Sequence, residues 1–377
     1  MVDKRRTAAH GLWCAVLCAA ATVSLTAPAS SATHTAAKEG ASGHGASAEA
    51  PSGNALKERY HAVKHGGIAT AANSAITCRS AVGNSEPCAS AQRGGESRND
   101  GYKMFYSDID RDKNTYNSTR AVLRLPKKSK VSYARLYWGG NLRVGEVKPA
   151  KDNGRVLLAE PGGSYRAVKA DTVHKHRRGD GADAYQASAN VTSLVRNHGP
   201  GAYTVAQLNV AMGHSKAGAW GGWTLVVAYE NSRSPLRDMT VWDGFAATED
   251  HPGGLPVATR RTNVPANAKG SVGIVGYDGD RGSGGESLTL APNKRAGVPL
   301  ANSANPAGDA FNSTITDRGK EVQGRVPAHR NTLGYDSDVF DASEALRSGA
   351  GNLLLRFASP EDDYLLGAVF AQFGTRR

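Results

Sequence analysis

Hydrophobic and polar positions alternate along much of the chain after Tyr60, which is the pattern of β-strands. The clearest run is Trp220–Asn231 (WGGWTLVVAYEN), in which every second side chain from Trp223 to Tyr229 is large and apolar and the side chains between them are compact. Both faces of such a strand can be buried, so we expect it to be a central strand of a layered core. Gly221 and Gly222 near its start and Pro235 beyond its end are typical of strand boundaries.

Similar runs follow one another at short intervals, and no stretch keeps a helical period for more than about two turns. The chain contains 44 glycines, which suits a fold with many turns. We therefore predict an all-β protein. The other predicted strands are Tyr102–Ile109, Arg120–Leu125, Val131–Trp138, Arg155–Glu160, Tyr165–Val168, Ala202–Ala211, Asp238–Phe245, Ser271–Tyr277, Ser287–Ala291, Phe311–Thr316, Asn352–Ala358 and Tyr364–Phe373.

The order of these parts in the first half of the chain recurs in the second half. In each half a cap residue, Asn190 or Asp341, precedes a single helical turn, a glycine-rich turn and a further strand. The recurrence indicates an internal duplication, although the general punctuation of β-sandwich chains is an alternative explanation. We predict two tandem jelly-roll-like β-sandwiches, at residues 59–247 and 248–377, with one large β-sandwich as the alternative.

The first 58 residues have a different character. A basic stretch is followed by the 15-residue apolar run Gly11–Leu25 and then by small residues, which predicts a secretory signal peptide at residues 1–32. The apolar run is shorter than the ~20 residues that a membrane-spanning helix needs. Residues 33–58 are rich in Ala, Gly, Ser and Thr, and they predict a disordered linker. We expect a secreted, extracellular protein, exported by the general secretory or the twin-arginine route, and no transmembrane segment in the mature chain.

Two of the four cysteines belong to the predicted signal peptide, and the other two are Cys78 and Cys88. They are separated mainly by small and polar residues. In an oxidising compartment we expect them to form one local disulfide, with two free thiols as the alternative.

The chain is basic, with a formal net charge of +12. Removal of residues 1–32 takes away a net charge of +2 and leaves +10. Such a charge favours contact with an anionic cell-wall polymer, an acidic glycan or nucleic acid, although a self-repelling soluble surface would have the same charge. The largest basic groups lie apart in the sequence, so we expect no specific nucleic-acid partner.

Aspartates at alternate positions are the strongest candidates for a metal site. Alternate carboxylates in a loop after a strand can turn several oxygens toward a hard cation such as calcium. The same residues also suit turns, because Asp and Asn side chains hydrogen-bond to their own backbone. The candidate ligands are Asp108, Asp110, Asp112, Asn114, Asp278, Asp280, Asp336 and Asp338.

Aromatic and basic residues interleave from Pro126 to Arg143, as they do on surfaces that stack sugars or bases. The candidate ligand-binding residues are Tyr133, Arg135 and Tyr137. Strand alternation offers the other explanation, in which the aromatic rings are part of the core.

No catalytic residue is indicated by motif or spacing. Asp243 with Glu249 or Asp250 is a possible acid/base pair of the glycosidase kind, but the sequence does not give the distance between the carboxyl groups on which that chemistry depends. We therefore favour a non-enzymatic protein over an enzyme.

Several segments in the same order, among them VSYARLYWGG, WGGWTLVVAYEN, GYDGDRGSGGESLTL and LGYDSDVFDAS, resemble a family of uncharacterised bacterial exported proteins. The resemblance covers residues 97–373. In many relatives this region precedes repeated surface modules of the type called domain of unknown function eleven. The resemblance implies a secreted or surface β-sandwich protein, and it supplies no catalytic residues. The chain ends at QFGTRR without such repeats, so we expect release or non-covalent wall association.

These features together predict a secreted, non-enzymatic β-sandwich protein that binds a glycan or cell-wall polymer or supports adhesion, with calcium as the one candidate cofactor. A secreted hydrolase that acts on polysaccharide and a purely structural wall or coat component are the alternatives.

Overall fold

The computed structural model describes residues 54–110, 112–259, 261–360 and 363–376. These residues belong to one compact unit, Ala50–Arg377. The predicted signal peptide at residues 1–32 and most of the predicted linker at residues 33–58 lie outside the described ranges. Strands account for 48% of the structure and helices for 7%, which confirms the prediction of an all-β sandwich protein.

The first sandwich consists of an inner and an outer sheet. Its inner sheet has the strand order β1-β11-β5-β9-β8, and its outer sheet has the order β4-β10-β6-β7. The inner strands are β1 (Lys57–Ser74), β11 (Gly221–Glu230), β5 (Lys130–Asn141), β9 (Asp183–Asn190) and β8 (Thr172–Arg177). The outer strands are β4 (Ser118–Leu123), β10 (Gly201–Ala206), β6 (Arg155–Ala159) and β7 (Arg166–Lys169).

The second sandwich repeats this arrangement. Its inner sheet contains the order β12-β22-β14-β20, and its outer sheet has the order β13-β21-β15-β16. The inner strands are β12 (Leu236–Ala247), β22 (Leu365–Gly374), β14 (Gly270–Tyr277) and β20 (Val339–Asp341), extended by β17 (Thr316–Asp317), β18 (Lys320–Glu321) and β19 (Tyr335–Asp336). The outer strands are β13 (Leu255–Ala258), β21 (Leu353–Ala358), β15 (Ser287–Pro292) and β16 (Val298–Pro299).

Both sandwiches have the topology of an eight-stranded jelly roll. Strands that occupy the same position in the two sandwiches follow each other in the same chain order. β1 corresponds to β12, β4 to β13, β5 to β14 and β6 to β15, and the last strands, β11 and β22, also correspond. The tandem jelly-roll prediction is therefore confirmed by the pairing order of the strands.

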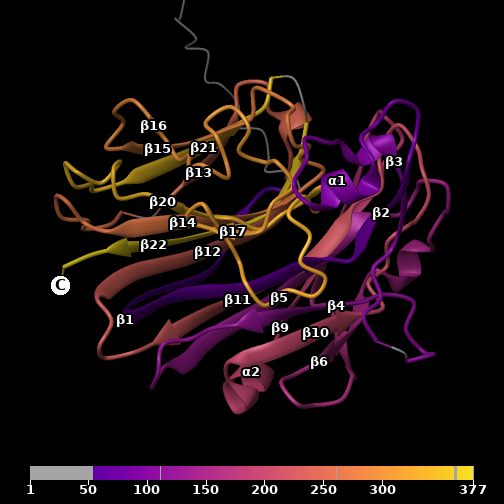
Figure 1. Ribbon diagram of the computed structural model, residues 1–377. Helices are drawn as coiled ribbons and strands as arrows, with labels where there is room; N and C mark the ends of the chain where they lie inside the picture. Colours follow the sequence, from indigo (N-terminus) through magenta and orange to yellow (C-terminus); the bar gives the residue numbers. More distant parts are fainter. Residues whose placement is uncertain (1–53, 111, 260, 361–362, 377) are drawn as a thin grey trace, which may run out of the picture. The chain divides into compact units, whose positions relative to one another are not determined.

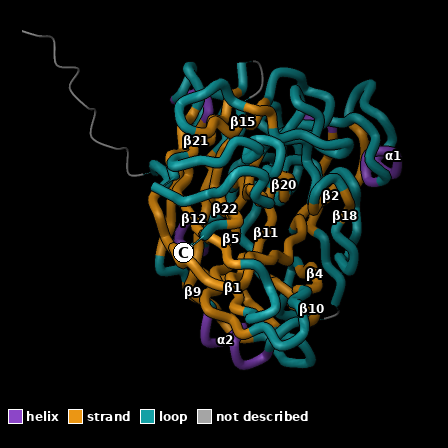
Figure 2. Tube along the Cα trace, turned by 90° about the vertical axis from the view of Figure 1, so that its left-hand side faces the viewer, coloured by secondary structure: helices purple, strands orange, loops and turns teal. Residues whose placement is uncertain are grey.

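Strand β1 connects the two sandwiches. Residues 57–65 pair with β12, and residues 66–74 pair with β11, antiparallel in both cases. β1 thereby joins the inner sheets into one 12-stranded sheet. Figure 1 shows the resulting layers, with β15 and β21 at the top, β14 and β22 below them, then β11 and β5, and β10 and β6 at the bottom. The same succession is visible from the side in Figure 2.

Three hydrophobic cores fill the spaces between the four layers. Leu225 of β11 packs in the core between the first inner and outer sheets, and Val369 of β22 packs in the core of the second sandwich. The third core lies between the two inner sheets, where Val226 of β11 packs with Val241 of β12 and Val275 of β14. β11 is thus buried on both faces, as its sequence predicts.

The two inner sheets approach each other closely at glycines. A Cβ atom on Gly222 of β11 would lie 2.6 Å from the ring of Tyr335 in β19. A Cβ on Gly367 of β22 would lie 1.9 Å from Oε1 of Gln186 in β9. Any larger residue at these positions would force the inner sheets apart.

The chain passes from the first inner sheet to the second between β11 and β12, at residues 231–235. β12 therefore lies with the C-terminal half of the chain. The predicted boundary between residues 247 and 248 would place β12 in the first sandwich. In the structure β12 pairs with β22 in the inner sheet of the second sandwich.

A hairpin and a few short helices complete the described chain. The hairpin strands are β2 (Ile76–Ala81) and β3 (Tyr102–Tyr106), and the helices are α1 (Cys88–Gln92), α2 (Thr192–His198), η1 (Asn99–Gly101), η2 (Ala150–Asp152) and η3 (Thr248–Asp250). The helical turn expected after Asn190 is α2, whereas the one expected after Asp341 is a series of turns. No helix within the described ranges has the length and apolar character to cross a membrane.

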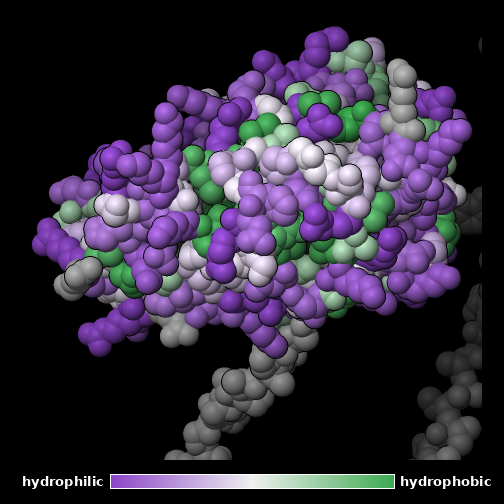
Figure 3. All heavy atoms as spheres, turned by 90° about the horizontal axis from the view of Figure 1, so that it is seen from below, coloured by the Kyte–Doolittle hydropathy of each residue, from purple (hydrophilic) through white to green (hydrophobic). Residues whose placement is uncertain are grey.

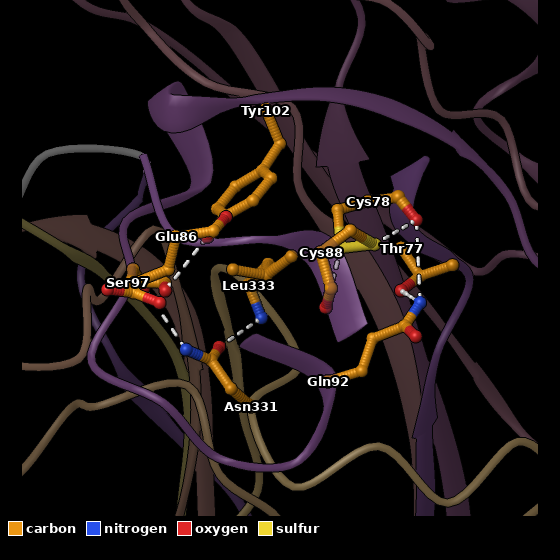
Figure 4. The surroundings of a disulfide bond; sticks show 9 residues. All are labelled: Thr77, Cys78, Glu86, Cys88, Gln92, Ser97, Tyr102, Asn331 and Leu333. Carbon is orange, nitrogen blue, oxygen red and sulfur yellow. Dashed lines mark hydrogen bonds between the residues drawn. A yellow bond between two sulfur atoms is a disulfide. The ribbon is translucent and has the colours of Figure 1, made fainter. Parts of the chain in front are cut away.

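Cys78 and Cys88 form the expected disulfide, with 5.7 Å between their Cα atoms. Figure 4 shows its surroundings, where Gln92 donates a hydrogen bond to the hydroxyl of Thr77 at 3.1 Å. Asn331, from the second half of the chain, donates to the carbonyl of Ser97 at 3.1 Å. The segment around the disulfide, residues 77–97, thus contacts the second half of the chain through Asn331.

Candidate functional site

The predicted ligand-binding residues Tyr133, Arg135 and Tyr137 all belong to β5. Arg135 is 2% exposed and Tyr137 is 0% exposed, because both side chains point between the two inner sheets. Tyr133 is 8% exposed, and its ring stacks on Tyr60 of β1 with 4.6 Å between the centroids. The structure thus brings the three residues together inside the protein, and a ligand at them stays a prediction.

Arg135 and Tyr137 are part of a polar cluster that joins the two sandwiches. Asp243 of β12 lies 3.1 Å from Nε of Arg135, 3.1 Å from the hydroxyl of Tyr137 and 2.7 Å from Nη2 of Arg59. Burial, followed by the charge of Asp243, raises the pKa of Tyr137 well above its ordinary value. Burial also raises the pKa of Tyr133 to about 12. Both phenols are therefore neutral at physiological pH.

The Asp108–Asn114 loop forms turns through its own side chains. Oδ1 of Asp110 accepts hydrogen bonds from the backbone N–H of Asp112 at 3.0 Å and from the hydroxyl of Thr115 at 3.1 Å. Oδ1 of Asp112 accepts from the backbone N–H of Asn114 at 2.9 Å. Burial acts to raise the pKa of Asp110, but hydrogen bonds from Tyr165 and from this loop hold it below its ordinary value. These contacts are those of Asx turns.

Asp278 and Asp280 are engaged by side chains from the first sandwich. The side-chain amide of Asn99 donates to Asp278 at 3.0 Å and to Asp280 at 2.9 Å. Arg178 forms an ion pair with Asp278 at 2.7 Å, and Arg98 lies 3.4 Å from Asp280. Both carboxylates thus hold the two halves of the chain together.

Asp336 and Asp338 have different surroundings. Both are 0% exposed. Oδ1 of Asp336 accepts from the backbone N–H of Thr314 at 2.9 Å, and Oδ1 of Asp338 accepts from the hydroxyl of Thr314 at 3.1 Å and from the backbone N–H of Thr316 at 2.8 Å. Burial raises the pKa of Asp338 to about 7, and burial together with the charge of Asp338 raises the pKa of Asp336 well above its ordinary value.

The three aspartate groups have separate sets of partners and do not form one site. Within the described ranges, no three His, Cys, Asp or Glu side chains are grouped so as to hold a metal ion. Calcium therefore stays a prediction. Among the eight candidate ligands, Asp336 and Asp338 are the two with a buried carboxylate oxygen that has no hydrogen-bond partner among the described residues.

A basic pocket, which the sequence did not predict, lies at one end of the second inner sheet. It has a volume of about 320 Å³, and its charged lining residues are Arg237, Lys269, Arg318 and Asp341. Three cations therefore surround one carboxylate. None of the three cations forms an ion pair within 4.0 Å with any residue that the structure describes. We call this cavity the basic pocket.

Sheet topology explains how the basic pocket forms. β12 and β14 are both antiparallel to β22, so the two strands begin at the same end of the sheet. Arg237 lies at the start of β12, and Lys269 directly precedes β14. Arg318 joins them from the turn between β17 and β18. Since these residues are far apart in the sequence, only the strand pairing could have revealed the pocket.

The cations of the basic pocket affect one another. Burial lowers the pKa of Arg237, and the charge of Arg318 lowers it further while Tyr229 opposes the change. Burial acts to raise the pKa of Asp341, but hydrogen bonds from Ser343 and the charges of Arg318 and Lys269 hold it below its ordinary value. The pocket thus has an excess of positive charge that an anion would neutralise.

Other surfaces of the described protein are less distinctive. A cleft of about 610 Å³ beside the disulfide segment is lined by carboxylates (Glu86, Glu96 and Asp100) and by two arginines (Arg98 and Arg281), so its charges are mixed. Figure 3, which views the molecule from the side of the first outer sheet, shows mainly hydrophilic side chains with separate hydrophobic patches between them.

Comparisons with known proteins give no function. No family model matches the chain. No curated protein matches it either. Among solved structures, it is similar to one titled as the atomic structure of Sulfolobus Turreted Icosahedral Virus, with 7% identity, a TM-score of 0.19, and coverage of 68% of this chain and 85% of that chain. The crystal structure titled "STIV MCP" matches with 8% identity, a TM-score of 0.17, and coverage of 68% and 90%. At such TM-scores neither match bears on function.

Proposed function

We propose that this chain is a secreted, non-enzymatic β-sandwich protein that binds an anionic glycan or cell-wall polymer. The basic pocket carries the proposal, because Arg237, Lys269 and Arg318 face one small cavity with a single carboxylate among them. Arginine guanidinium groups form paired, charge-assisted hydrogen bonds with phosphate and carboxylate groups. An anionic group of a polymer is therefore the ligand that this pocket suits best.

The charge of the whole chain supports the same ligand class. Without the predicted signal peptide the formal net charge is +10, so a polyanion is attracted from a distance before it reaches the pocket. The described surface also exposes few large hydrophobic side chains, such as Phe105 at 39% and Val147 at 71%. A polar, charged ligand fits this surface better than an apolar one.

The same pocket favours binding over hydrolysis. Glycosidases use two carboxyl groups on either side of the bond that they break. Asp341 is the one carboxylate that lines the basic pocket. Asp243, one of the acid/base candidates, is 3% exposed and engaged by Arg59 and Arg135.

A panel experiment tests the proposal. The mature protein is incubated with polyphosphate, an acidic glycan and a neutral glycan, and both retention and the release of reducing ends are measured. We expect salt-sensitive retention on the anionic polymers without turnover. Release of reducing ends, or equal retention on the neutral glycan, would contradict the proposal.

A further inference from the structure

We propose that Asp336 and Asp338 bind one hard divalent cation, such as Ca²⁺, inside the second jelly roll. This site uses none of the residues that line the basic pocket, so the two proposals are tested by different variants.

The two carboxyl groups lie close together. Thr314 contacts both, through its backbone N–H to Asp336 at 2.9 Å and through its hydroxyl to Asp338 at 3.1 Å. The two aspartates are also two positions apart in an extended segment beside β14, and side chains at that spacing point to the same side. The pair can therefore face one ion.

Oxygens in this cluster lack hydrogen-bond partners although they are fully buried. Oδ2 of Asp336 and Oδ2 of Asp338 have none among the residues that the structure describes. The hydroxyl of Tyr364, also 0% exposed, has none either, and it interacts electrostatically with Glu286 and, less strongly, with Asp336. Buried polar atoms without partners are rare in folded proteins, and an ion or ordered water is one usual explanation.

The charges around the pair are mostly negative. The charge of Asp309, a partly buried carboxylate, acts on Asp336 in addition to that of Asp338. Arg325 is the one cation whose electrostatic interaction with Asp338 is resolved among the described residues, and its guanidinium donates to the carbonyl of His329 at 2.8 Å. One arginine leaves an excess of buried negative charge, which is costly unless a proton or a cation neutralises it.

A divalent cation accounts for more of these features than a proton does. A single proton shared between the carboxyl groups balances the pair together with Arg325, but it leaves the buried hydroxyl of Tyr364 without a partner among the described residues. A doubly charged ion neutralises both carboxylates and can accept the Oδ2 atoms as ligands, with backbone carbonyls and water as further oxygen ligands. Such a site needs only two acidic side chains, so it is compatible with the lack of larger acidic groups among the described residues.

The other predicted metal ligands differ from this pair, because their carboxylates are engaged by other groups of the protein. In the Asp108–Asn114 loop the carboxylates accept hydrogen bonds from their own turn, and Asp278 and Asp280 are held by Asn99 and by arginines. We therefore assign calcium to Asp336 and Asp338 alone.

Terbium luminescence tests this assignment, because Tb³⁺ occupies calcium sites and is excited through nearby tyrosines such as Tyr335 and Tyr364. The mature protein should bind one equivalent of Tb³⁺, which Ca²⁺ displaces. The D336N/D338N variant should lose the sensitised emission, with binding at least about tenfold weaker. The D110N/D112N variant, which removes two charges from the exposed loop, should keep it.

Two results would overturn the assignment. One is a loss of emission in D110N/D112N with emission kept in D336N/D338N. The other is a wild-type protein that binds less than half an equivalent of ⁴⁵Ca²⁺ in equilibrium dialysis at about 1 mM, the weak end of the range for extracellular calcium modules. The dialysis uses only the unmodified protein, so it decides the question even if the double variant does not fold. Polyphosphate retention should be the same with and without calcium.

Discussion

Gln186 of β9 connects the two jelly rolls through one amide group. Its Nε2 donates hydrogen bonds to the carbonyl of Gly244 in β12 at 2.8 Å and to the carbonyl of Gly367 in β22 at 2.9 Å. Its Oε1 accepts from the hydroxyl of Tyr277 in β14 at 3.0 Å. The side chain is 1% exposed, so no water replaces these contacts if the amide is removed.

The change Gln186→Leu keeps the approximate size of the side chain and leaves two carbonyls and one hydroxyl without partners. We expect the free energy of unfolding to fall by about 2–4 kcal/mol, measured by urea unfolding. Gln323→Leu, at an exposed position, is the matched control and should change it by less than about 0.5 kcal/mol. Equal effects of the two changes would show that Gln186 does not connect the sandwiches.

The sequence shows which aspartates are candidates but not which of them remain available to a ligand. Asp110 and Asp112 have partners within a few residues, so turn chemistry could be anticipated there. Asp280 is held by Asn99, which is 181 positions away in the chain. Such partners become neighbours only when the sheets have paired.

At the scale of elements, strands with strong alternation could be predicted and strands without it could not. β5, β11, β12, β14 and β22 were predicted, although β5 and β12 extend further than expected. β1 was missed, because KERYHAVKHGGIATAANS is rich in polar and small residues and has Gly66 and Gly67 at its middle. Its polar first half lies at the surface and its small second half fits between closely packed sheets, so tertiary context decides its conformation.

Phe311–Thr316 was predicted as a strand, but only Thr316 belongs to one, in β17. The hydroxyl of Ser313 donates to the carbonyl of Gly279 at 2.6 Å, and Asn312 donates to the carbonyl of Ala304 at 2.7 Å. These side-chain contacts to the backbone replace the hydrogen bonds of a ladder.

A substitution at Gly222 tests how closely the two inner sheets must pack. Gly222→Ala would place a methyl group 2.6 Å from the ring of Tyr335, whose hydroxyl is fixed 2.7 Å from Thr224 Oγ1. We expect a loss of about 2–3 kcal/mol in the free energy of unfolding.

Gly253→Ala is the control, because nothing lies within 4 Å of the added atom and the backbone there is not left-handed. It should leave the melting temperature nearly unchanged. A stable Gly222→Ala protein with an unchanged melting temperature would mean that the inner sheets can separate at no cost.

At the scale of the whole molecule, the repeated order of parts in the sequence corresponds to two jelly rolls with the same strand order. The way in which the jelly rolls join could not be read from the sequence. It depends on β1 pairing with strands of both sandwiches and on a third core between them. The basic pocket has the same origin, since it collects residues from positions 237, 269 and 318 at one sheet end.

The proposed function requires that the basic pocket, rather than general surface charge, binds the anionic polymer. Two variants that each lose three positive charges distinguish these possibilities. R237Q/K269Q/R318Q removes the cations of the pocket, and K127Q/K128Q/K151Q removes exposed lysines elsewhere. Melting temperatures close to that of the parent protein establish that both variants are folded.

The deciding measurement is the dissociation constant for polyphosphate at a fixed salt concentration. We predict that the pocket variant binds about 30-fold more weakly or worse, because charge-assisted contacts to the polymer are lost. The surface variant should weaken binding by no more than about threefold, through the reduced long-range attraction alone. Equal weakening in both variants, or none in the pocket variant, would contradict the account.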